Sequence, residues 1–244
     1  MSFESKPDCA LCDYRNGNLD IHFQRLGLPG DLSKNQILRT PNFVVKPDSF
    51  PVHPNGRHVL IHPRNHGVNF ATMGEHASEI GEAVYAIEQL WGERVAIFEH
   101  GGSLTNEESS VQSIYHAHVH IVGGLGDVDV IRYMSDMLNG GLEHDGLTYP
   151  HSVSWVPNDA FVENLKYHYG EDPYLYIQQG GTAIYAADPL NIMRSQITQR
   201  SLHSWFSRTT ELNWKQFGEN EEFAALAANR ILTLLDHCNN RSAY

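Results

Sequence analysis

Short apolar runs bounded by Pro, Asn and Gly dominate the first half of the chain, and one long amphipathic stretch interrupts them. The runs at residues 43–45, 57–62 and 94–98 predict β-strands. Thr72 and Glu75 have the spacing of a capping box, which predicts an amphipathic helix with Thr72 as its N-cap. The apolar stripe of this helix consists of Met73, Ala77, Ile80, Val84, Ile87 and Trp91.

The second half of the chain mixes helical and strand patterns. Residues 127–138, 191–207 and 221–237 predict helices, and residues 174–178 and 182–185 predict a β-hairpin across Gln-Gly-Gly. No Pro- or Ser-rich linker separates the halves, so we expect one compact α+β unit with a large C-terminal extension. The buried face of the last helix is predicted to hold Phe223, Leu226, Ala227, Ile231 and Leu234.

The run at residues 114–122 predicts a strand that carries three histidines. Because side chains alternate between the two faces of a strand, His116, His118 and His120 are expected to share one face. The apolar residues between them would point into a core. A row of imidazoles on an otherwise apolar strand packs poorly without partners, which indicates a functional face.

Three interpretations of this histidine row are open. It could be an exposed strand face, although such a face more naturally uses Thr, Lys or Glu. It could be a metal site, because imidazoles are common ligands. It could also hold a nucleophile, since one ring nitrogen can attack phosphorus when the other donates a hydrogen bond to a fixed acceptor. His118, with a histidine two positions away on each side, is the candidate nucleophile.

Charge and composition restrict the partners. The 244 residues carry 29 Asp and Glu against 17 Lys and Arg, for a formal charge of −12. Because the chain is this acidic, it gains little from counterion release. We therefore expect no nucleic-acid or anionic-membrane binding. A ligand phosphate would need a local site built from a few residues.

Cysteine usage and the N-terminal sequence bear on the compartment. The chain has 3 cysteines, a poor count for a disulfide framework at this length. Its start has neither the basic nor the apolar region of a signal peptide, and no apolar run is long enough to span a membrane. We therefore expect a cytoplasmic protein.

Three segments together resemble the histidine-triad (HIT) family. QSIYHAHVHIVGG at residues 112–124 resembles the family signature, His-x-His-x-His followed by two apolar residues. RHVLIHPRNH at residues 57–66 and CALC at residues 9–12 resemble two upstream segments, in family order and spacing. The resemblance implies a HIT-like antiparallel sheet with packed helices. It divides the chain into a catalytic domain at residues 1–126 and an α/β extension at residues 127–244, packed on it and not independent.

The resemblance also implies an activity, that of a nucleotidyl hydrolase that cleaves a nucleotide conjugate at the α-phosphate through a covalent nucleotidyl-histidine. His118 would be the nucleophile, His116 and His120 would orient it and stabilise charge, and His58 would support them. Ser113 matches a position that contacts the phosphate or the leaving group.

Two further positions near the row are candidate substrate contacts. Gln112, which lies next to Ser113, is a candidate contact of the same kind. The FEHG segment at residues 98–101 has Glu99 where many small members have Asn, which resembles a longer branch of the family. The role of Glu99 is left open as a substrate contact.

The cysteine pair bears on metal. By resemblance to zinc-binding members and to the related hexose-1-phosphate uridylyltransferases, Cys9, Cys12, His66 and His116 would hold a structural zinc. Two ordinary buried thiols are the alternative. The proposed chemistry needs no redox cofactor.

In the extension, SQITQR at residues 195–200 partly resembles a helix of the longer branch, so Gln196 and Arg200 are candidates to contact the ligand phosphates. An ordinary polar helix face is the alternative. Many members are homodimers, and the extension either leaves that surface open or covers it.

Rival functions stay open at this point. A phosphorylase or nucleotidyltransferase would share the first step and differ in the acceptor. A non-catalytic nucleotide-binding module and a metal-storage or metal-sensing protein are the other two.

Overall fold

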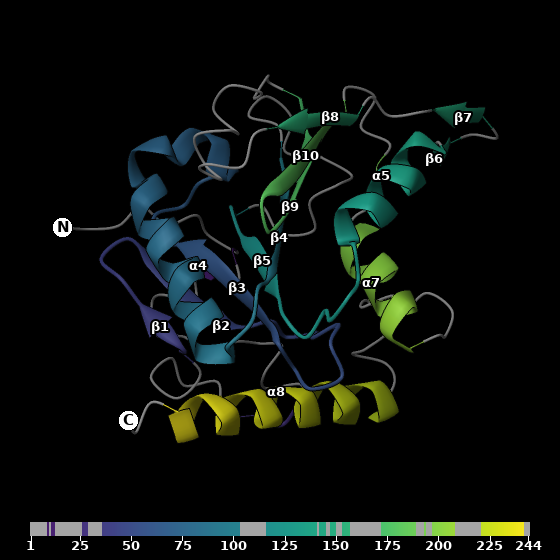
Figure 1. Cartoon of the computed structure of the whole chain (residues 1–244). Helices are drawn as coiled ribbons and strands as arrows, with labels where there is room; N and C mark the ends of the chain where they lie inside the picture. Colours follow the sequence, from purple (N-terminus) through teal and green to yellow (C-terminus); the bar gives the residue numbers. More distant parts are fainter. Residues whose placement is uncertain are drawn as a thin grey trace.

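An eight-stranded antiparallel sheet forms the centre of the protein in the computed structural model (Figure 1). The structure describes residues 9, 11–12, 26–28, 36–102, 116–140, 142–144, 147–149, 153–156, 172–188, 193, 197–207 and 221–241. The strand order is β1-β2-β3-β5-β4-β9-β10-β8. The strands are β1 (Leu38–Arg39), β2 (Phe43–Pro47), β3 (His58–Pro63), β4 (Ala96–Gly101), β5 (Val119–Val122), β8 (Val153–Val156), β9 (Tyr174–Gln179) and β10 (Thr182–Ala187). The predicted α+β fold is therefore confirmed.

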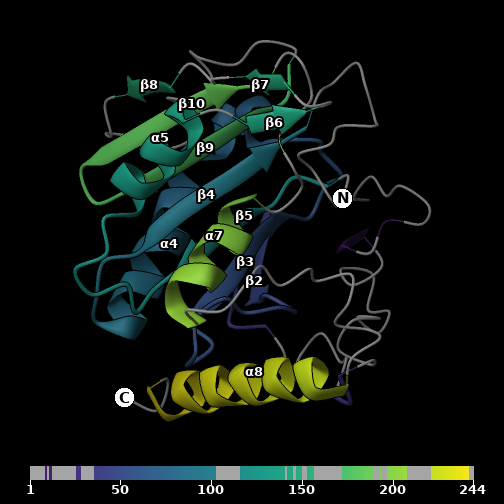
Figure 2. The same cartoon turned by 90° about the vertical axis from the view of Figure 1, so that its right-hand side faces the viewer.

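Helices cover both faces of this sheet. The helix α4 (Ala77–Trp91) packs on one face, and α5 (Val130–Asn139) and α7 (Ile197–Ser207) pack on the other (Figure 2). A separate pair of strands, β6 (Leu142–His144) and β7 (Leu147–Tyr149), lies outside the main sheet. None of the helices in the described part of the chain has the length and apolar character needed to cross a bilayer.

Strand alternation divides the core in two. In β5, Val119 and Ile121 face α4, whereas His120 and Val122 face α5 and α7. Burial of such aliphatic side chains contributes about 1.5–3 kcal/mol each. The core on the α4 side includes Phe43, Val45, Val59, Ile61, Ile80, Ile87, Ile97, Val119 and Ile121.

The start of the long amphipathic helix differs from the prediction. A 3₁₀ helix, η1 (Phe70–His76), precedes α4. Thr72 lies within η1 and is therefore not the N-cap of α4. Instead, the Asn69 side chain accepts a hydrogen bond from the Thr72 backbone N–H at 3.3 Å. Asn is a better capping residue than Thr, and here it lies one turn earlier. The helix ends at Trp91 and is followed by the C-cap Gly92, whose φ of 70° suits glycine.

The histidine-bearing strand is shorter than predicted. Of the described part of this segment, residues 116–122, only Val119–Val122 form a strand, while His116 and His118 lie just before it. The neighbouring strand β3 ends at Pro63, which has no backbone N–H, and the pairing with β5 stops at Ile61 and Val119. The three histidines therefore do not form one straight row.

The predicted hairpin in the second half is confirmed as β9 and β10, with Gly180 at φ 57° in the turn. Strand β9 pairs with β4, so the sheet continues across the predicted boundary between residues 126 and 127. Predicted helices at residues 127–138 and 191–207 correspond to α5 and α7.

The last predicted helix is α8 (Glu221–Arg241), which lies beside β2 at one end of the sheet (Figure 1). Ala227, Ile231 and Leu234 are buried as predicted, but Leu226 is 39% exposed. The buried stripe continues to Cys238, at spacings of three and four, and Leu226 lies beside it on the helix surface. The side chain of Phe223 lies outside the described ones.

Candidate functional site

His118 has a fixed tautomer. Its Nδ1 lies 2.7 Å from the backbone oxygen of His116. A carbonyl oxygen only accepts, so Nδ1 carries the proton and Nε2 carries the lone pair. Burial lowers the pKa of His118, although the hydrogen bond to His116 and the charge of Asp48 oppose this. The ring is therefore neutral near pH 7, as a nucleophilic imidazole must be.

His120 belongs to a network around Asp48. The Nδ1 of His120 lies 3.2 Å from Oδ2 of Asp48, and the Nε2 of His58 lies 3.4 Å from the same oxygen. The two ring nitrogens are 3.0 Å apart. The other oxygen of Asp48 accepts from the backbone N–H of Phe50 at 2.7 Å. Asp48 was not predicted, and it supplies the acceptor that holds two histidines in place.

The charges in this network follow from burial and pairing. Burial alone would raise the pKa of Asp48, but attraction to His58 and the hydrogen bond from His120 hold it below its usual range. Burial lowers the pKa of His58 and brings that of His120 to about 3, with Asp48 opposing both shifts. At neutral pH the network holds one carboxylate and two neutral imidazoles.

These three side chains also place possible ligand atoms within 4.8 Å of one another. However, Nδ1 of His58 accepts a hydrogen bond from the backbone N–H of Val52 at 3.3 Å. Its proton is then on Nε2, the nitrogen that would have to bind the metal. The hydrogen bonds therefore favour a proton-bearing network over a metal site at Asp48.

Helix α7 from the extension reaches the histidines. The amide nitrogen of Gln199 lies 3.4 Å from Nε2 of His120, and Oγ1 of Thr198 lies 3.1 Å from Nε2 of His100. Neither Gln199 nor Thr198 was predicted. The predicted Arg200 follows on the same helix and is half-buried. Three other predicted contacts lie outside the described residues: Gln112, Ser113 and Gln196.

Lys46 is another residue that sequence reasoning missed. It lies in β2 opposite Leu60, which in turn lies opposite His120, so all three side chains share the histidine face. Lys46 is 1% exposed. After burial, its positive charge is among the factors that lower the pKa of His62 and His118. Lys46 and Asp48 lie two positions apart, and side chains at this spacing on a strand share one face. This spacing could have indicated that both residues face the histidines.

Glu99 lies away from this face. Phe98 pairs with His120, so the next side chain along β4 points to the opposite side of the sheet. There Glu99 is fully buried and accepts hydrogen bonds from the backbone N–H of Phe70 and the hydroxyl of Tyr174, both at 2.7 Å. The structure thus places Glu99 on the side of the sheet opposite the histidines, and its substrate contact stays a prediction.

Glu99 should make stability depend on pH. Burial raises its pKa to about 8, well above the ordinary range of a glutamate carboxyl, although its two hydrogen bonds oppose this. The folded state then binds the proton more tightly, so stability is highest at low pH and falls as pH rises toward 8. Relative to Glu99→Gln, the parent should lose about 3 kcal/mol between about pH 6 and about pH 9, measured by urea unfolding. Parallel pH profiles of parent and variant would contradict this.

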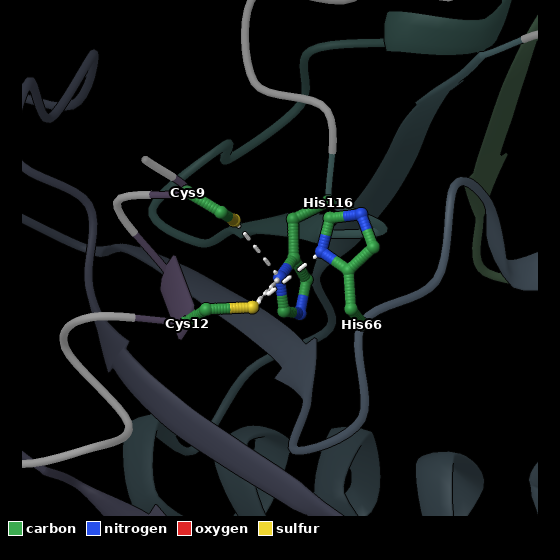
Figure 3. Close-up of side chains that lie close together, drawn as sticks. All are labelled: Cys9, Cys12, His66 and His116. Atoms are coloured by element: carbon green, nitrogen blue, oxygen red, sulfur yellow. Dashed lines mark hydrogen bonds between the residues drawn. The ribbon is translucent and has the colours of Figure 1, made fainter. Parts of the chain in front are cut away.

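Two cysteines and two histidines form a separate cluster (Figure 3). Sγ of Cys12 lies 3.4 Å from Nδ1 of both His66 and His116, and Sγ of Cys9 lies 3.4 Å from Nδ1 of His116. All four ligand atoms lie within 4.8 Å of one another. In a tetrahedral zinc site, metal bonds of about 2.3 Å to sulfur and about 2.0 Å to nitrogen put the ligands about 3.5 Å apart. The donor set and its spacing fit such an ion.

The tautomer of His116 also suits a metal ligand. Its Nε2 donates to the backbone oxygen of Pro63 at 2.9 Å, which leaves the lone pair of Nδ1 facing Cys9 and Cys12. The ring of His116 therefore belongs to the cysteine cluster. Its backbone oxygen, in contrast, accepts from the ring of His118. The main chain of His116 thus orients the ring of His118, and the catalytic role of His116 stays a prediction.

Comparison with known proteins gives one curated relative. No family model matches the chain. An uncharacterized HIT-like protein of Chlamydia muridarum (strain MoPn / Nigg) is 28% identical over 114 residues, which cover 44% of this chain and 84% of that protein. This match confirms the resemblance to histidine-triad proteins that the motifs carry.

Solved structures give two further likenesses. A HIT family hydrolase from Clostridium thermocellum is 19% identical over 51% of this chain and 95% of its own, with a TM-score of 0.34. The yeast Ap4A phosphorylase Apa2, in complex with AMP, is 14% identical over 78% of this chain and 72% of its own, with a TM-score of 0.40. The relation to hexose-1-phosphate uridylyltransferases stays a prediction. Residue roles are therefore derived below from contacts within this chain.

Proposed function

We propose that the protein is a nucleotidyl hydrolase that cleaves a nucleotide conjugate at its α-phosphate through a covalent nucleotidyl-histidine on His118. The observation that carries this proposal is the 2.7 Å hydrogen bond from His118 Nδ1 to the oxygen of His116, which leaves the lone pair on Nε2. The similarity to a HIT-like protein supports the histidine-triad motif on which this proposal rests.

The proposed reaction has two displacements at phosphorus. First, the Nε2 lone pair of His118 attacks the α-phosphorus, a P–N bond forms, and the leaving group departs with its bonding pair and takes up a proton. The positive charge that develops on the ring is stabilised by the acceptor at Nδ1. Water then attacks the same phosphorus, the P–N bond breaks, and a nucleoside monophosphate, the neutral imidazole and one proton are released.

We further propose that Cys9, Cys12, His66 and His116 hold a zinc ion. Four protein ligands close a tetrahedral set, so the ion would supply structure and would leave no position for water or substrate. The cluster would fix the main chain of His116, whose oxygen orients His118. Ser113, Gln112 and Gln196 stay proposed ligand contacts by resemblance, and the homodimer and the cytoplasmic location stay predictions.

The test is a substrate panel with product identification. The purified protein is incubated with nucleoside phosphoramidates, dinucleoside polyphosphates and nucleotide sugars, in the presence and absence of inorganic phosphate, and products and protein are analysed by mass spectrometry. Hydrolysis gives a nucleoside monophosphate and a transient nucleotide adduct on the protein. A nucleoside diphosphate formed only with phosphate would instead identify a phosphorylase. Binding of the panel without turnover would identify a non-catalytic module.

Lys46 is the proposed counter-charge for the ligand phosphate. At neutral pH the described histidine network is anionic through Asp48, which repels a phosphate. Among the described residues, two Lys or Arg side chains are buried, those of Lys46 and Arg230. Arg230 lies on α8 and donates a hydrogen bond to the backbone oxygen of Pro51 at 2.7 Å. Lys46, on the histidine face, is therefore the buried cation placed to offset that charge.

The Lys46→Met variant is expected to raise KM about tenfold or more, because a charge-assisted hydrogen bond to the phosphate is lost at nearly constant side-chain length. Arg200→Ala, at the cation predicted from sequence, is measured beside it. Arg57→Met is the matched control, since Arg57 pairs with Glu93 at 2.6 Å, and its kinetics should equal those of the parent. A Lys46→Met variant with parental KM and kcat, beside an impaired Arg200→Ala, would move the role to Arg200.

A further inference from the structure

We propose that Gln199 is a positioning residue that fixes the tautomer of His120, so that helix α7 of the extension completes the histidine centre. The proposal rests on the proposed function for its kinetic consequence, but its structural content stands on the contacts of His120 alone. Gln199 would act through His120 and would need no contact with the substrate.

Both nitrogens of His120 have partners of defined chemistry. Nδ1 lies 3.2 Å from a carboxylate oxygen of Asp48, which can only accept while ionised. Nε2 lies 3.4 Å from the amide nitrogen of Gln199, which can only donate, at the long end of the hydrogen-bond range. These two contacts favour a proton on Nδ1 and a lone pair on Nε2. Nε2 of His58, which carries the proton of that ring, lies 3.0 Å from the same Nδ1 and opposes this arrangement. It also lies 3.4 Å from Oδ2 of Asp48, so both ring N–H groups can donate to the one carboxylate oxygen.

The ring plane of His120 is fixed by packing. Phe98 stacks on it with the ring centroids 4.6 Å apart and the planes 10° apart. His118 meets it edge-on, at 5.0 Å and 71°. These two contacts fix the plane of the ring, so the position of the proton on His120 is the remaining variable. Asp48 and Gln199 act on that position from opposite edges of the ring.

Helix α7 is anchored well enough to hold Gln199 in place. The side chains of Ile197 and Leu202 are buried in the core that contains Phe98. Thr198, the residue before Gln199, contacts Nε2 of His100 at 3.1 Å, and burial holds the pKa of His100 well below its usual value. Two adjacent residues of the first helical turn thus contact two histidines on neighbouring strands.

The consequence for the proposed reaction concerns the edge of His120 that carries Nε2. With the proton held at Nδ1, Nε2 presents a lone pair next to the nucleophile His118, where it can exchange a proton with a bound ligand. The opposite tautomer would turn a lone pair toward the carboxylate of Asp48, which is unfavourable. Gln199 therefore contributes the second of two restraints on His120.

The experiment reads the tautomer directly. Protein labelled with ¹⁵N at histidine is examined by long-range ¹H–¹⁵N correlation NMR, with the His120 signals assigned by their loss in His120→Gln. The parent should show a protonated Nδ1 and an unprotonated Nε2. Gln199→Leu, of similar size and without a donor, should mix the two tautomers, and its kcat should fall about tenfold with KM within about threefold.

A second variant makes an opposite change. Gln199→Glu replaces the donor with an acceptor, so it should draw a proton to Nε2 and move both His120 signals toward those of an imidazolium. Ser201→Ala is the matched control, because Ser201 Oγ donates to Ile197 O within the same helix at 2.8 Å. The control should retain the parental spectrum and kinetics.

Two results would overturn the proposal: a parent with the proton of His120 on Nε2, or unchanged His120 signals in both Gln199 variants. Because the NMR measurement needs no substrate, it is separable from the proposed function. A parent that shows the predicted tautomer but turns over no substrate would contradict the hydrolase and leave the role of Gln199 in positioning His120 intact.

Discussion

Replacement of His118 by Ala is expected to lower turnover by about a thousandfold or more, because it removes the atom that we propose forms the covalent bond to phosphorus. Among the described residues, the ring of His118 makes one hydrogen bond, from Nδ1 to the oxygen of His116, so its removal leaves the network around Asp48 in place. Nucleotide binding and thermal stability should change little. The measurement is kcat and KM on the best substrate of the panel, with calorimetric titration of the product nucleotide.

The matched control for His118→Ala is His53→Ala. His53 is also buried, but it lies over Gly124 and Phe206, away from the nucleophile. Its loss should lower stability and leave kcat within about threefold of the parent. Mass spectrometry of quenched protein adds a qualitative readout, since the nucleotide adduct should be present in the parent and the control and absent from His118→Ala. Turnover of His118→Ala within tenfold of the parent would exclude a covalent role for this residue.

The second large effect concerns metal. Purified protein should carry about one zinc ion per chain, and Cys12→Ser should lose it, because Cys12 contacts both histidines of the cluster. Binding to the folded state alone stabilises that state, so Tm should fall by about 10 °C on loss of the ion. Metal analysis and calorimetry of the parent, Cys9→Ser and Cys12→Ser measure both quantities.

Cys238→Ala serves as the control for the cysteine variants. Cys238 is buried on α8 and lies in the core on the α4 side, apart from the cluster. This variant should retain zinc and lose only the modest stability of a buried small side chain. A parent that is free of metal and as stable as a zinc-loaded sample would return Cys9 and Cys12 to two ordinary buried thiols.

Sequence patterns predicted well those features of the fold that depend on residues close together in the chain. The alternation of apolar and polar positions placed β2, β3, β9 and β10 and the helices α5 and α8 within a few residues of their observed ends. The resemblance also named Cys9, Cys12, His66 and His116 as one set, and the structure brings these four together. Such features need only local spacing or a recognised motif.

The partners of His120 could not be predicted in the same way. Asp48 and Gln199 are separated from it by 72 and 79 positions, and they reach it through the register of β2 and β3 and the packing of α7. Neither register nor helix docking can be read from periodicity. Glu99 is different, because its position one residue from Phe98 already sets the face it occupies.

The residue His116 has a further consequence for how the chain folds. Its contact with Cys12 joins positions 104 residues apart, and the loop so closed contains strands β2, β3 and β4. Contacts of such high sequence separation form late, because the entropy of loop closure must be overcome first. The proposed nucleophile, His118, takes its orientation from this same residue. The orientation of the imidazole at His118 therefore depends on a contact that closes a long loop, and a chain that lacks this contact would hold an unoriented imidazole.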